Sequence, residues 1–302
     1  MLNYLVAMLT FAGLYALMAI GLNLIWGMAG MINLGLVGFF ALGAYASALG
    51  TMKLGLPLAL GPVAAASLAA AAGAVVAVVT ARLRGDYLAI VTLGFAEIVR
   101  LVASNEIWLT NGTDGLSGIP GPLRGRIAPE AFNLLFLAIT VASVALAVLV
   151  ADRIRFSPFG RVLRAIRDDD QVASVAGKRV LRFKVQAFAV GAAIIGFAGA
   201  LYGQYTSYVA PEIFVPLITI YIVLALAAGG TGNNRGAVLG SVLVVFFMEG
   251  TRFVAPLLSG LAPVQVAALR EFTISVSLIL VLRFRPEGIL PERLPRPKEP
   301  LP

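Results

Sequence analysis

Residues 21–45 read GLNLIWGMAGMINLGLVGFFALGAY and carry no charged side chain. Six glycines and two asparagines interrupt a run that is otherwise apolar enough for lipid. A simple membrane-spanning helix gains nothing from so many residues that weaken a helix. The stretch therefore raises two questions: whether the chain lies in a membrane, and why a helix would be weakened there.

Composition answers the first question. Of the 302 residues, 60% are apolar and 13% are charged, and the mean hydropathy is +0.93, whereas a soluble domain has about 25% charged residues. Charge-free runs cover residues 1–52, 54–81 and 185–211. Since about 20 apolar residues cross a bilayer, each run holds one or two spans. We predict an all-α, polytopic integral membrane protein that forms a single transmembrane domain over residues 1–302.

The apolar segments predict about nine transmembrane helices, within a range of eight to ten. No basic region precedes the first, so we expect it to be retained as a span rather than cleaved as a signal peptide. The predicted spans cover residues 4–26, 31–51, 56–81, 87–109, 131–151, 185–206, 215–230, 236–254 and 265–283.

Basic residues give the orientation, because Lys and Arg gather in cytoplasmic loops. Residues 152–184 hold nine of the 23 basic residues, and the chain from Arg283 onward holds five more. We therefore predict that the 152–184 loop and the tail 285–302 are cytoplasmic, and that the N-terminus and the loop 111–129 are external. Anionic lipid headgroups beside the inside loops then account for the net charge of +8 better than nucleic acid does.

The glycines of residues 21–45 are spaced by 6, 3, 5, 3 and 5 residues, never by the four of a small-residue packing motif. Two interpretations stay open. Either the helix is broken near residues 27–35 and borders a translocation pathway, since non-helical backbone in a membrane must be buried in protein or line a watery cavity, or each glycine only permits tight packing. For the second glycine cluster, residues 229–236, Arg235 favours a cytoplasmic turn between spans.

Two pairs of opposite charges lie within predicted spans. Glu97 and Arg100, like Glu249 and Arg252, are three residues apart and share a helix face. Ionisable residues inside a membrane are costly. Each pair therefore either neutralises itself at a helix interface or lines the route of a zwitterionic substrate. We favour neutralisation for Glu249 and Arg252, and both interpretations stay open for Glu97 and Arg100. The candidate pathway residues are Asn23, Gly30, Asn33, Gly35, Thr92 and Glu97.

The 152–184 loop carries a patterned segment rather than a plain run of charge. Pro158 begins an amphipathic helix, and Gly177 is a plausible stop after three aspartates and a short apolar stretch. We interpret the segment as a docking surface for another protein. Its apolar side consists of Val162, Leu163 and Ile166, and its basic side of Arg161, Arg164 and Arg167.

Several chemistries are excluded by residues that the chain lacks. It has no cysteine and no histidine, which excludes disulfides, Ser–His hydrolases and His-Glu-x-x-His zinc sites. It has no Gly-x-x-x-x-Gly-Lys-[Ser/Thr] phosphate-binding loop. We expect no enzyme activity, no metal and no cofactor in this chain, so that any ATP must be bound by a partner.

Five stretches, in the same order along the chain, resemble the permease subunits of bacterial ABC importers for branched-chain amino acids, specifically the M-type subunit. The second and third of them read GDYLAIVTLGFAEIVR and TNGTDGLSGIP, and the second separates this subunit best from related urea-type and sugar-type permeases. The five stretches are residues 21–45, 85–100, 110–120, 160–168 and 284–289.

The resemblance implies a multi-pass protein of the bacterial inner membrane that shares its channel with a second, H-type permease. Two ATP-binding cassette subunits would bind below, and a periplasmic amino-acid-binding protein would deliver the substrate and set much of the selectivity. Residues 160–177 resemble the helix that seats in the ATPase, although Asp170-x-x-Ala-Ser-x-x-Gly177 matches the Glu-Ala-Ala-x-x-x-Gly pattern of many importers only loosely. The implied coupling residues are Arg161, Arg164, Asp168, Ala173 and Gly177.

An alternative function is a stand-alone secondary transporter or channel for a small polar solute such as urea or an amide. Such a carrier would follow an ion gradient without a partner, whereas an importer subunit would stop when ATP hydrolysis by its partner is blocked.

Overall fold

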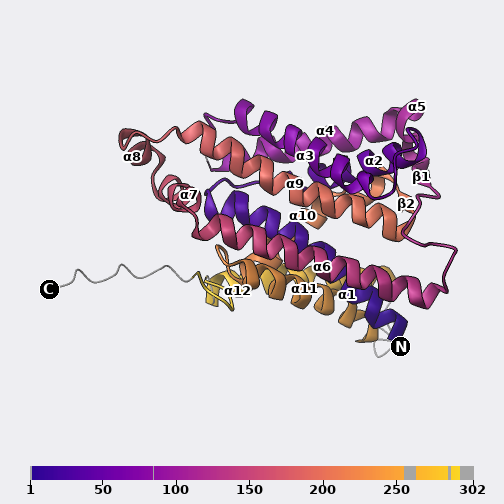
Figure 1. Cartoon of the computed structure of the whole chain (residues 1–302). Helices are drawn as coiled ribbons and strands as arrows, with labels where there is room; N and C mark the ends of the chain where they lie inside the picture. Colours follow the sequence, from indigo (N-terminus) through magenta and orange to yellow (C-terminus); the bar gives the residue numbers. More distant parts are fainter. Residues whose placement is uncertain (1, 84, 255–262, 285–286, 293–302) are drawn as a thin grey trace.

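A computed structural model describes residues 2–83, 85–254, 263–284 and 287–292, and within these ranges the protein is a bundle of long helices (Figure 1). The long helices are α1 (Leu2–Leu22), α2 (Leu36–Met52), α3 (Leu60–Val79), α4 (Asp86–Asn105), α6 (Pro129–Phe156), α9 (Val180–Thr206), α10 (Pro216–Gly229), α11 (Asn234–Val254) and α12 (Pro263–Phe284). Each of the nine predicted spans overlaps one of them.

Six helical segments of the described residues are long and apolar enough to cross a membrane. They are Leu2–Met28, Leu60–Val79, Asp86–Asn105, Pro129–Phe156, Val180–Thr206 and Pro211–Gly229, and α2 is a shorter apolar helix. The prediction of a polytopic all-α membrane protein is thus confirmed, while the count of nine spans stays a prediction.

The first helix does not end in a simple loop. After α1 the backbone widens into the π-helix η1 (Asn23–Met28) and then runs without helix to Gly35. The predicted break near residues 27–35 is therefore present, and the predicted second span is wrong at its start, because α2 begins at Leu36 and not at residue 31. The chain turns between α10 and α11 at residues 230–233, as predicted for the second glycine cluster; the cytoplasmic side of this turn stays a prediction.

The connection between α6 and α9 is shorter than predicted, because both helices extend past their predicted spans. Proline at 158 disfavours helical backbone at Ser157, so α6 ends before that residue. The Ser157 hydroxyl accepts a hydrogen bond from the Gly160 N–H at 3.2 Å and thereby caps the next helix. Two short helices follow, α7 (Pro158–Asp168) and α8 (Asp170–Val175). They lie at one end of the bundle, and the N-terminus lies at the other (Figure 1).

The end of the bundle that holds the N-terminus is closed by small elements. These are α5 (Ile107–Thr110), η2 (Gly112–Asp114), η3 (Pro211–Ile213) and an antiparallel pair of strands, β1 (Leu116–Ser117) and β2 (Tyr208–Val209). The predicted fourth span is too long, because α4 ends at Asn105 and α5 is a separate turn.

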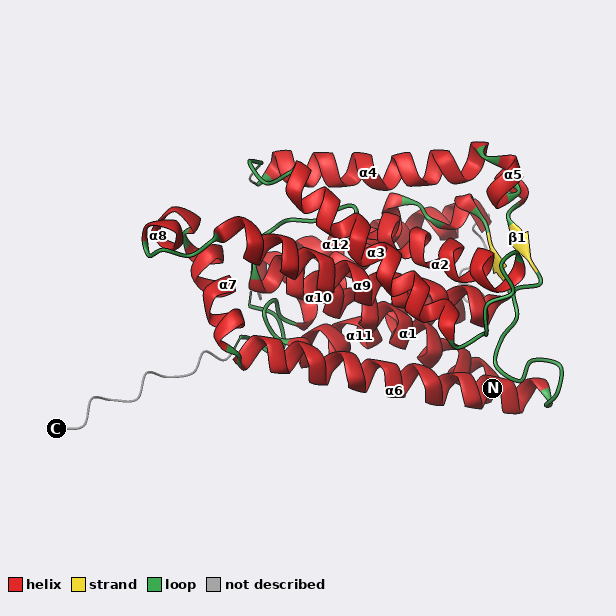
Figure 2. Ribbon diagram, turned by 45° about the horizontal axis from the view of Figure 1, so that its top comes forward, coloured by secondary structure: helices red, strands yellow, loops and turns green. Residues whose placement is uncertain are grey.

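Helix α9 runs through the middle of the bundle (Figure 2) and packs on α1, α2 and α3. The fully buried Phe39 of α2 joins two neighbours, with its ring centroid 5.7 Å from that of Phe188 on α9 and 4.7 Å from that of Phe95 on α4.

Four glycines of residues 21–45 also serve packing. A Cβ at Gly21 would lie 2.6 Å from the Gly191 carbonyl oxygen of α9, and one at Gly38 would lie 2.8 Å from the Cα of Ala96 on α4. A Cβ at Gly35 would overlap the Thr92 carbonyl, and one at Gly43 would overlap Gly196. The stretch therefore combines both of the features that the sequence suggested: a broken helix and close helix packing.

We predict that Gly35→Ala lowers the thermal stability of the purified subunit in detergent, whereas Gly94→Ala does not. The added methyl at position 35 would meet backbone, and overpacking costs about 1–3 kcal/mol. No atom lies within 4 Å of a Cβ at Gly94, and alanine favours a helix over glycine by about 1 kcal/mol. Equal melting of the two variants, measured as loss of the monodisperse peak after heating, would contradict this account of Gly35.

Candidate functional site

A buried chain of hydrogen bonds begins at the break after α1. Asn23, fully buried in η1, donates from Nδ2 to Asn234 Oδ1 at 2.8 Å and accepts the Gly232 N–H at 2.8 Å. Asn234, at the start of α11, donates in turn to Asp152 Oδ1 of α6 at 2.8 Å. The amides thus tie the broken helix to the α10–α11 turn and to the helix that leads into α7.

Arg167, near the end of α7, makes a second connection to the break. Its Nη1 donates to the Gly27 carbonyl oxygen at 2.5 Å and to Glu292 Oε2 at 2.9 Å. Gly30 leaves space for it, since a Cβ there would lie 2.9 Å from Arg167 Cγ, and its φ of +70° also favours glycine. One guanidinium therefore joins α7, the broken helix and the C-terminal segment.

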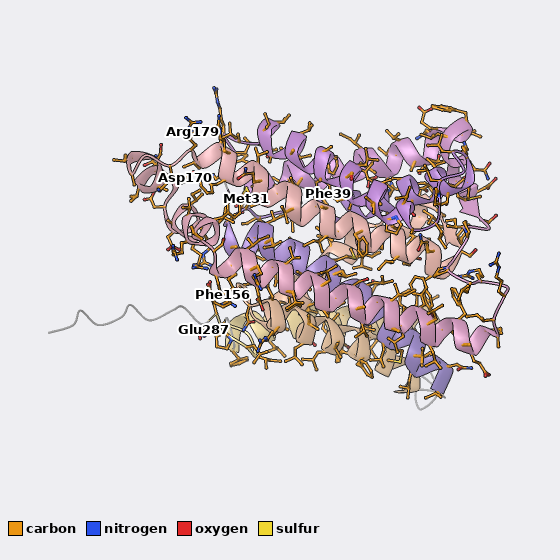
Figure 3. The ribbon with its side chains drawn as sticks, viewed as in Figure 1. Met31, Phe39, Phe156, Asp170, Arg179 and Glu287 are labelled. Carbon is orange, nitrogen blue, oxygen red and sulfur yellow. The ribbon has the colours of Figure 1, made fainter. Side chains whose placement is uncertain are left out.

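The C-terminal segment, residues 287–292, packs on the α10–α11 turn. The Ile289 N–H donates to the Ala228 carbonyl at 2.9 Å, and the Leu290 N–H to the Gly229 carbonyl at 2.9 Å. Glu287 lies at the same end of the bundle as Phe156, Asp170 and Arg179 (Figure 3). Of the predicted tail 285–302, residues 285–286 and 293–302 lie outside the described part of the chain.

The basic side of α7 is divided between two environments. Leu163 and Ile166 are buried as the apolar pattern predicts. Arg164, however, is half-buried and donates to the Arg155 carbonyl at 2.9 Å, so that it turns toward the bundle as Arg167 does. Arg161 is exposed. Of the three arginines, only Arg161 is thus exposed, while the other two bind backbone carbonyls of this chain; the docking role of this side stays a prediction.

The three consecutive aspartates have three different roles. Asp168 is exposed, with its Oδ1 3.6 Å from Arg167 Nε. Asp169 caps α8 by accepting the N–H groups of Gln171 at 2.8 Å and Val172 at 3.1 Å. Asp170 forms an ion pair with Lys184 of α9 at 3.0 Å, with both side chains largely buried.

A groove of about 540 Å³ separates α7 from α8. Among its lining residues are Arg161, Asp168 and Ala173, three of the five predicted coupling residues. Ala173 is only 4% exposed, so it lies at the base of the groove rather than at its rim. Gly177 ends α8 with φ +76°, a value that L side chains rarely adopt.

The predicted pathway residues fall into three groups. Asn33, Gly35 and Thr92 lie together: Asn33 Oδ1 accepts the Gly35 N–H at 2.9 Å, and Thr92 Oγ1 accepts the Leu34 N–H at 3.1 Å. Asn33 and Thr92 are fully buried, and Asn33 Nδ2 has no partner among the described residues. Asn23 and Gly30 lie nearer α7, in the hydrogen-bonded region of the break.

Glu97 is not part of either group. It pairs with Arg100 on α4, and the two side chains are 39% and 29% exposed, respectively. Of the second predicted pair, the side chain of Arg252 lies outside the described part of the chain, while Glu249 accepts a hydrogen bond from the Tyr4 hydroxyl.

A polar pocket of about 350 Å³ lies between the predicted pathway region at the break and the predicted coupling region at α7. Its lining includes Gly30 and Met31 of the break as well as Asp168 of α7. Arg167 and Lys184 also line it. Within the described ranges, no cluster of three or more acidic residues has an arrangement that could hold a metal ion.

Several residues of this region were not singled out from the sequence as site residues. Asp169 had a local signal, since aspartate before a short helical run is a helix cap. Asn234 and Glu292 had none, because their partners are 211 and 125 positions away along the chain.

The comparisons with known proteins show which family the chain belongs to. A family model described as "Branched-chain amino acid transport system / permease component" matches residues 4–282. No solved structure matches the chain.

Relatives of two types are similar over most of the chain. The high-affinity branched-chain amino acid transport system permease protein LivM of Escherichia coli (strain K12) is 33% identical, over 96% of this chain and 70% of the relative. A probable LivM protein of Methanocaldococcus jannaschii is 28% identical, over 93% and 91%. LivH of Escherichia coli (strain K12), described as a permease protein of the same kind of system, is 27% identical, over 93% and 92%. The chain therefore belongs to the family of branched-chain amino acid transport permease components.

Proposed function

We propose that this protein is the M-type permease of an ATP-driven importer for branched-chain amino acids. It would form half of the translocation pathway with an H-type permease, in a bacterial inner membrane. The observation that carries the proposal is the arrangement at one end of the bundle, where α7 and α8 present a groove outward while Arg167 of α7 binds the Gly27 carbonyl of the broken helix. A partner bound to the groove would contact Asp168, the neighbour in sequence of the arginine that binds the break.

The charge distribution supports a cytoplasmic position for this end. The connection between α6 and α9 and the segment 287–292 lie there together, as the excess of Lys and Arg around both predicts. The motor would then bind from the cytoplasm.

The surface of α8 suits a protein partner. Val172 and Val175 of α8 are 65% and 91% exposed. Lipid does not account for these exposed apolar side chains, because α8 lies beyond the ends of the spanning helices. Val172 lines the groove together with Arg161 and Asp168, which provides the mixed contact typical of a docking site. Because this chain has no phosphate-binding loop, we assign ATP to two ATP-binding cassette subunits, and substrate delivery to a periplasmic binding protein.

Reconstitution tests the function against the stand-alone carrier. We expect leucine uptake into proteoliposomes only when this chain is combined with an H-type permease, the ATPase subunits, the binding protein and ATP. Uptake should stop when the ATPase subunits bind ATP without hydrolysing it. Uptake by this chain alone, driven by an ion gradient, would overturn the proposal.

A pair of arginine variants separates docking from transmission. Arg161→Glu should weaken co-purification of the ATPase subunits, because it reverses an exposed charge in the groove. Arg167→Ala should leave co-purification intact and lower leucine transport per ATP hydrolysed about tenfold, since a hydrogen bond to a charged group contributes about 1.5–3 kcal/mol. If both variants lost ATPase binding equally, Arg167 would be a docking residue and the assignment would fail.

Gly177 supplies a backbone test of the same loop. We predict that Gly177→Pro abolishes coupled transport but leaves membrane insertion intact, because proline fixes φ near −65° where the loop has +76°. Gly177→Asn is the matched control, since asparagine tolerates left-handed backbone, and should retain most transport. Full transport by the proline variant, at equal abundance in the membrane, would show that the shape of this turn does not matter.

A further inference from the structure

The outer face of α4 carries an ion pair at an unusual depth. Glu97 accepts from Arg100 Nε at 3.0 Å; Glu97 lies near the middle of the helix Asp86–Asn105, and Arg100 lies one turn nearer its C-terminal end. Neither side chain is buried in the subunit, since they are 39% and 29% exposed. Figure 2 shows α4 along one edge of the bundle.

Lipid is a poor environment for such a pair. Arginine or acidic residues near the centre of a spanning helix cost about 2.5–3.5 kcal/mol each on insertion scales and face protein or water in known bundles. Two of the five N–H donors of Arg100 are used on Glu97. The remaining donors can bind only acceptors that lipid tails do not have.

Two other outer helices show what a lipid-facing surface of this protein contains. Helix α3, and α6 between residues 131 and 151, have no charged residue at all. Their exposed side chains are apolar, among them Val75 on α3 and Val141 on α6, apart from Ser67, whose hydroxyl donates to the Val63 carbonyl of its own helix. The charge on α4 therefore distinguishes its outer face from theirs.

Gly94 lies one turn before Glu97 on the same face and is exposed. No atom lies within 4 Å of a Cβ there, in contrast to Gly73 of α3, where a Cβ would lie 2.6 Å from the Ala192 Cβ of α9. A glycine on a membrane helix lets another helix approach closely. On α3 that approach is made within this chain, whereas on α4 the space is open.

We propose that this face of α4 is the surface on which the H-type permease docks, with the Glu97–Arg100 pair at the interface. The α4 docking face consists of Ile90, Gly94, Glu97, Arg100, Ile98 and Leu101. The inference rests on the proposed function, because it takes the partner to be a second permease. An ATPase or a periplasmic protein binds outside the lipid and cannot reach the middle of α4, whereas another membrane subunit can cover it with both apolar and polar groups.

The chain has no cysteine, so a single introduced cysteine reports its own position. We would attach a nitroxide spin label at Ile98→Cys, or at Val141→Cys as the control on α6. These two side chains are 62% and 58% exposed, respectively. Each labelled protein is placed in lipid alone, with the H-type permease, and with a twofold excess of unlabelled copies of itself.

The oxygen accessibility of the label at position 98 should fall about threefold or more when the H-type permease is added, since packed interfaces exclude lipid, and that at position 141 should stay unchanged. Co-purification from the same sample reports assembly separately. Assembly with protection at position 141 and not 98 overturns the α4 docking face but leaves the proposed function standing. No assembly overturns both. Protection of position 98 by copies of this chain alone overturns the choice of partner.

A bulky side chain tests the same face without a label. Gly94→Leu should reduce co-purification of the H-type permease about tenfold, while Ala145→Leu, at an exposed position on α6, should not. No atom lies within 4 Å of a Cβ at position 94, and the melting temperature of the isolated variant checks that α4 is intact. Normal assembly by an intact Gly94→Leu protein overturns the proposal.

Discussion

The structure depends on the need to satisfy backbone and amide groups where the first helix stops in the membrane. A helix end leaves carbonyl and N–H groups without partners, and lipid cannot supply any. In this protein, side chains supply the partners. Asn23 accepts the Gly232 N–H and donates to Asn234, and Arg167 donates to the Gly27 carbonyl. Each partner comes from a distant part of the chain. The break therefore holds together α1, the α10–α11 turn, α6 and α7 at one end of the bundle.

The sequence indicated the break itself, because glycines and asparagines in a charge-free run are unfavourable for a continuous helix. It also indicated where α7 begins and where α8 ends, through Pro158 and Gly177, but it placed the adjoining ends of α6 and α9 too far apart. What it could not supply is the partner of each polar group. Asn23 and Asn234 are 211 positions apart, and no local pattern pairs them. Nor does an amphipathic pattern say which side meets the protein. Two of the three arginines on the basic side of α7 turn inward and donate to backbone carbonyls of this chain.

The candidate pathway residues illustrate the same limit. Polar type and membrane depth singled out Asn33, Thr92 and Glu97 alike, yet the fold separates them. Asn33 and Thr92 stabilise the irregular segment before α2 from within the subunit, whereas Glu97 lies on the opposite, outward side of α4. A polar residue that is buried beside the break and a polar residue on an outer face cannot be told apart from the sequence. Only the packing of α2 against one face of α4, through Gly35 and Gly38, decides between these two roles.

Glycine has opposite consequences at the two surfaces that the proposed assembly would use. At Gly35 and Gly38, α4 already occupies the space that a side chain would need. The contact is therefore made within the subunit and fixes where the broken segment lies. At Gly94 the corresponding space is open, and the Glu97–Arg100 ion pair, which is unfavourable in lipid, begins one turn further along the helix. The ion pair makes this outer face costly in lipid, and the glycine beside it leaves room for another helix. The same two features together suit a helix from another membrane subunit, which can approach closely at the glycine and provide acceptors for Arg100.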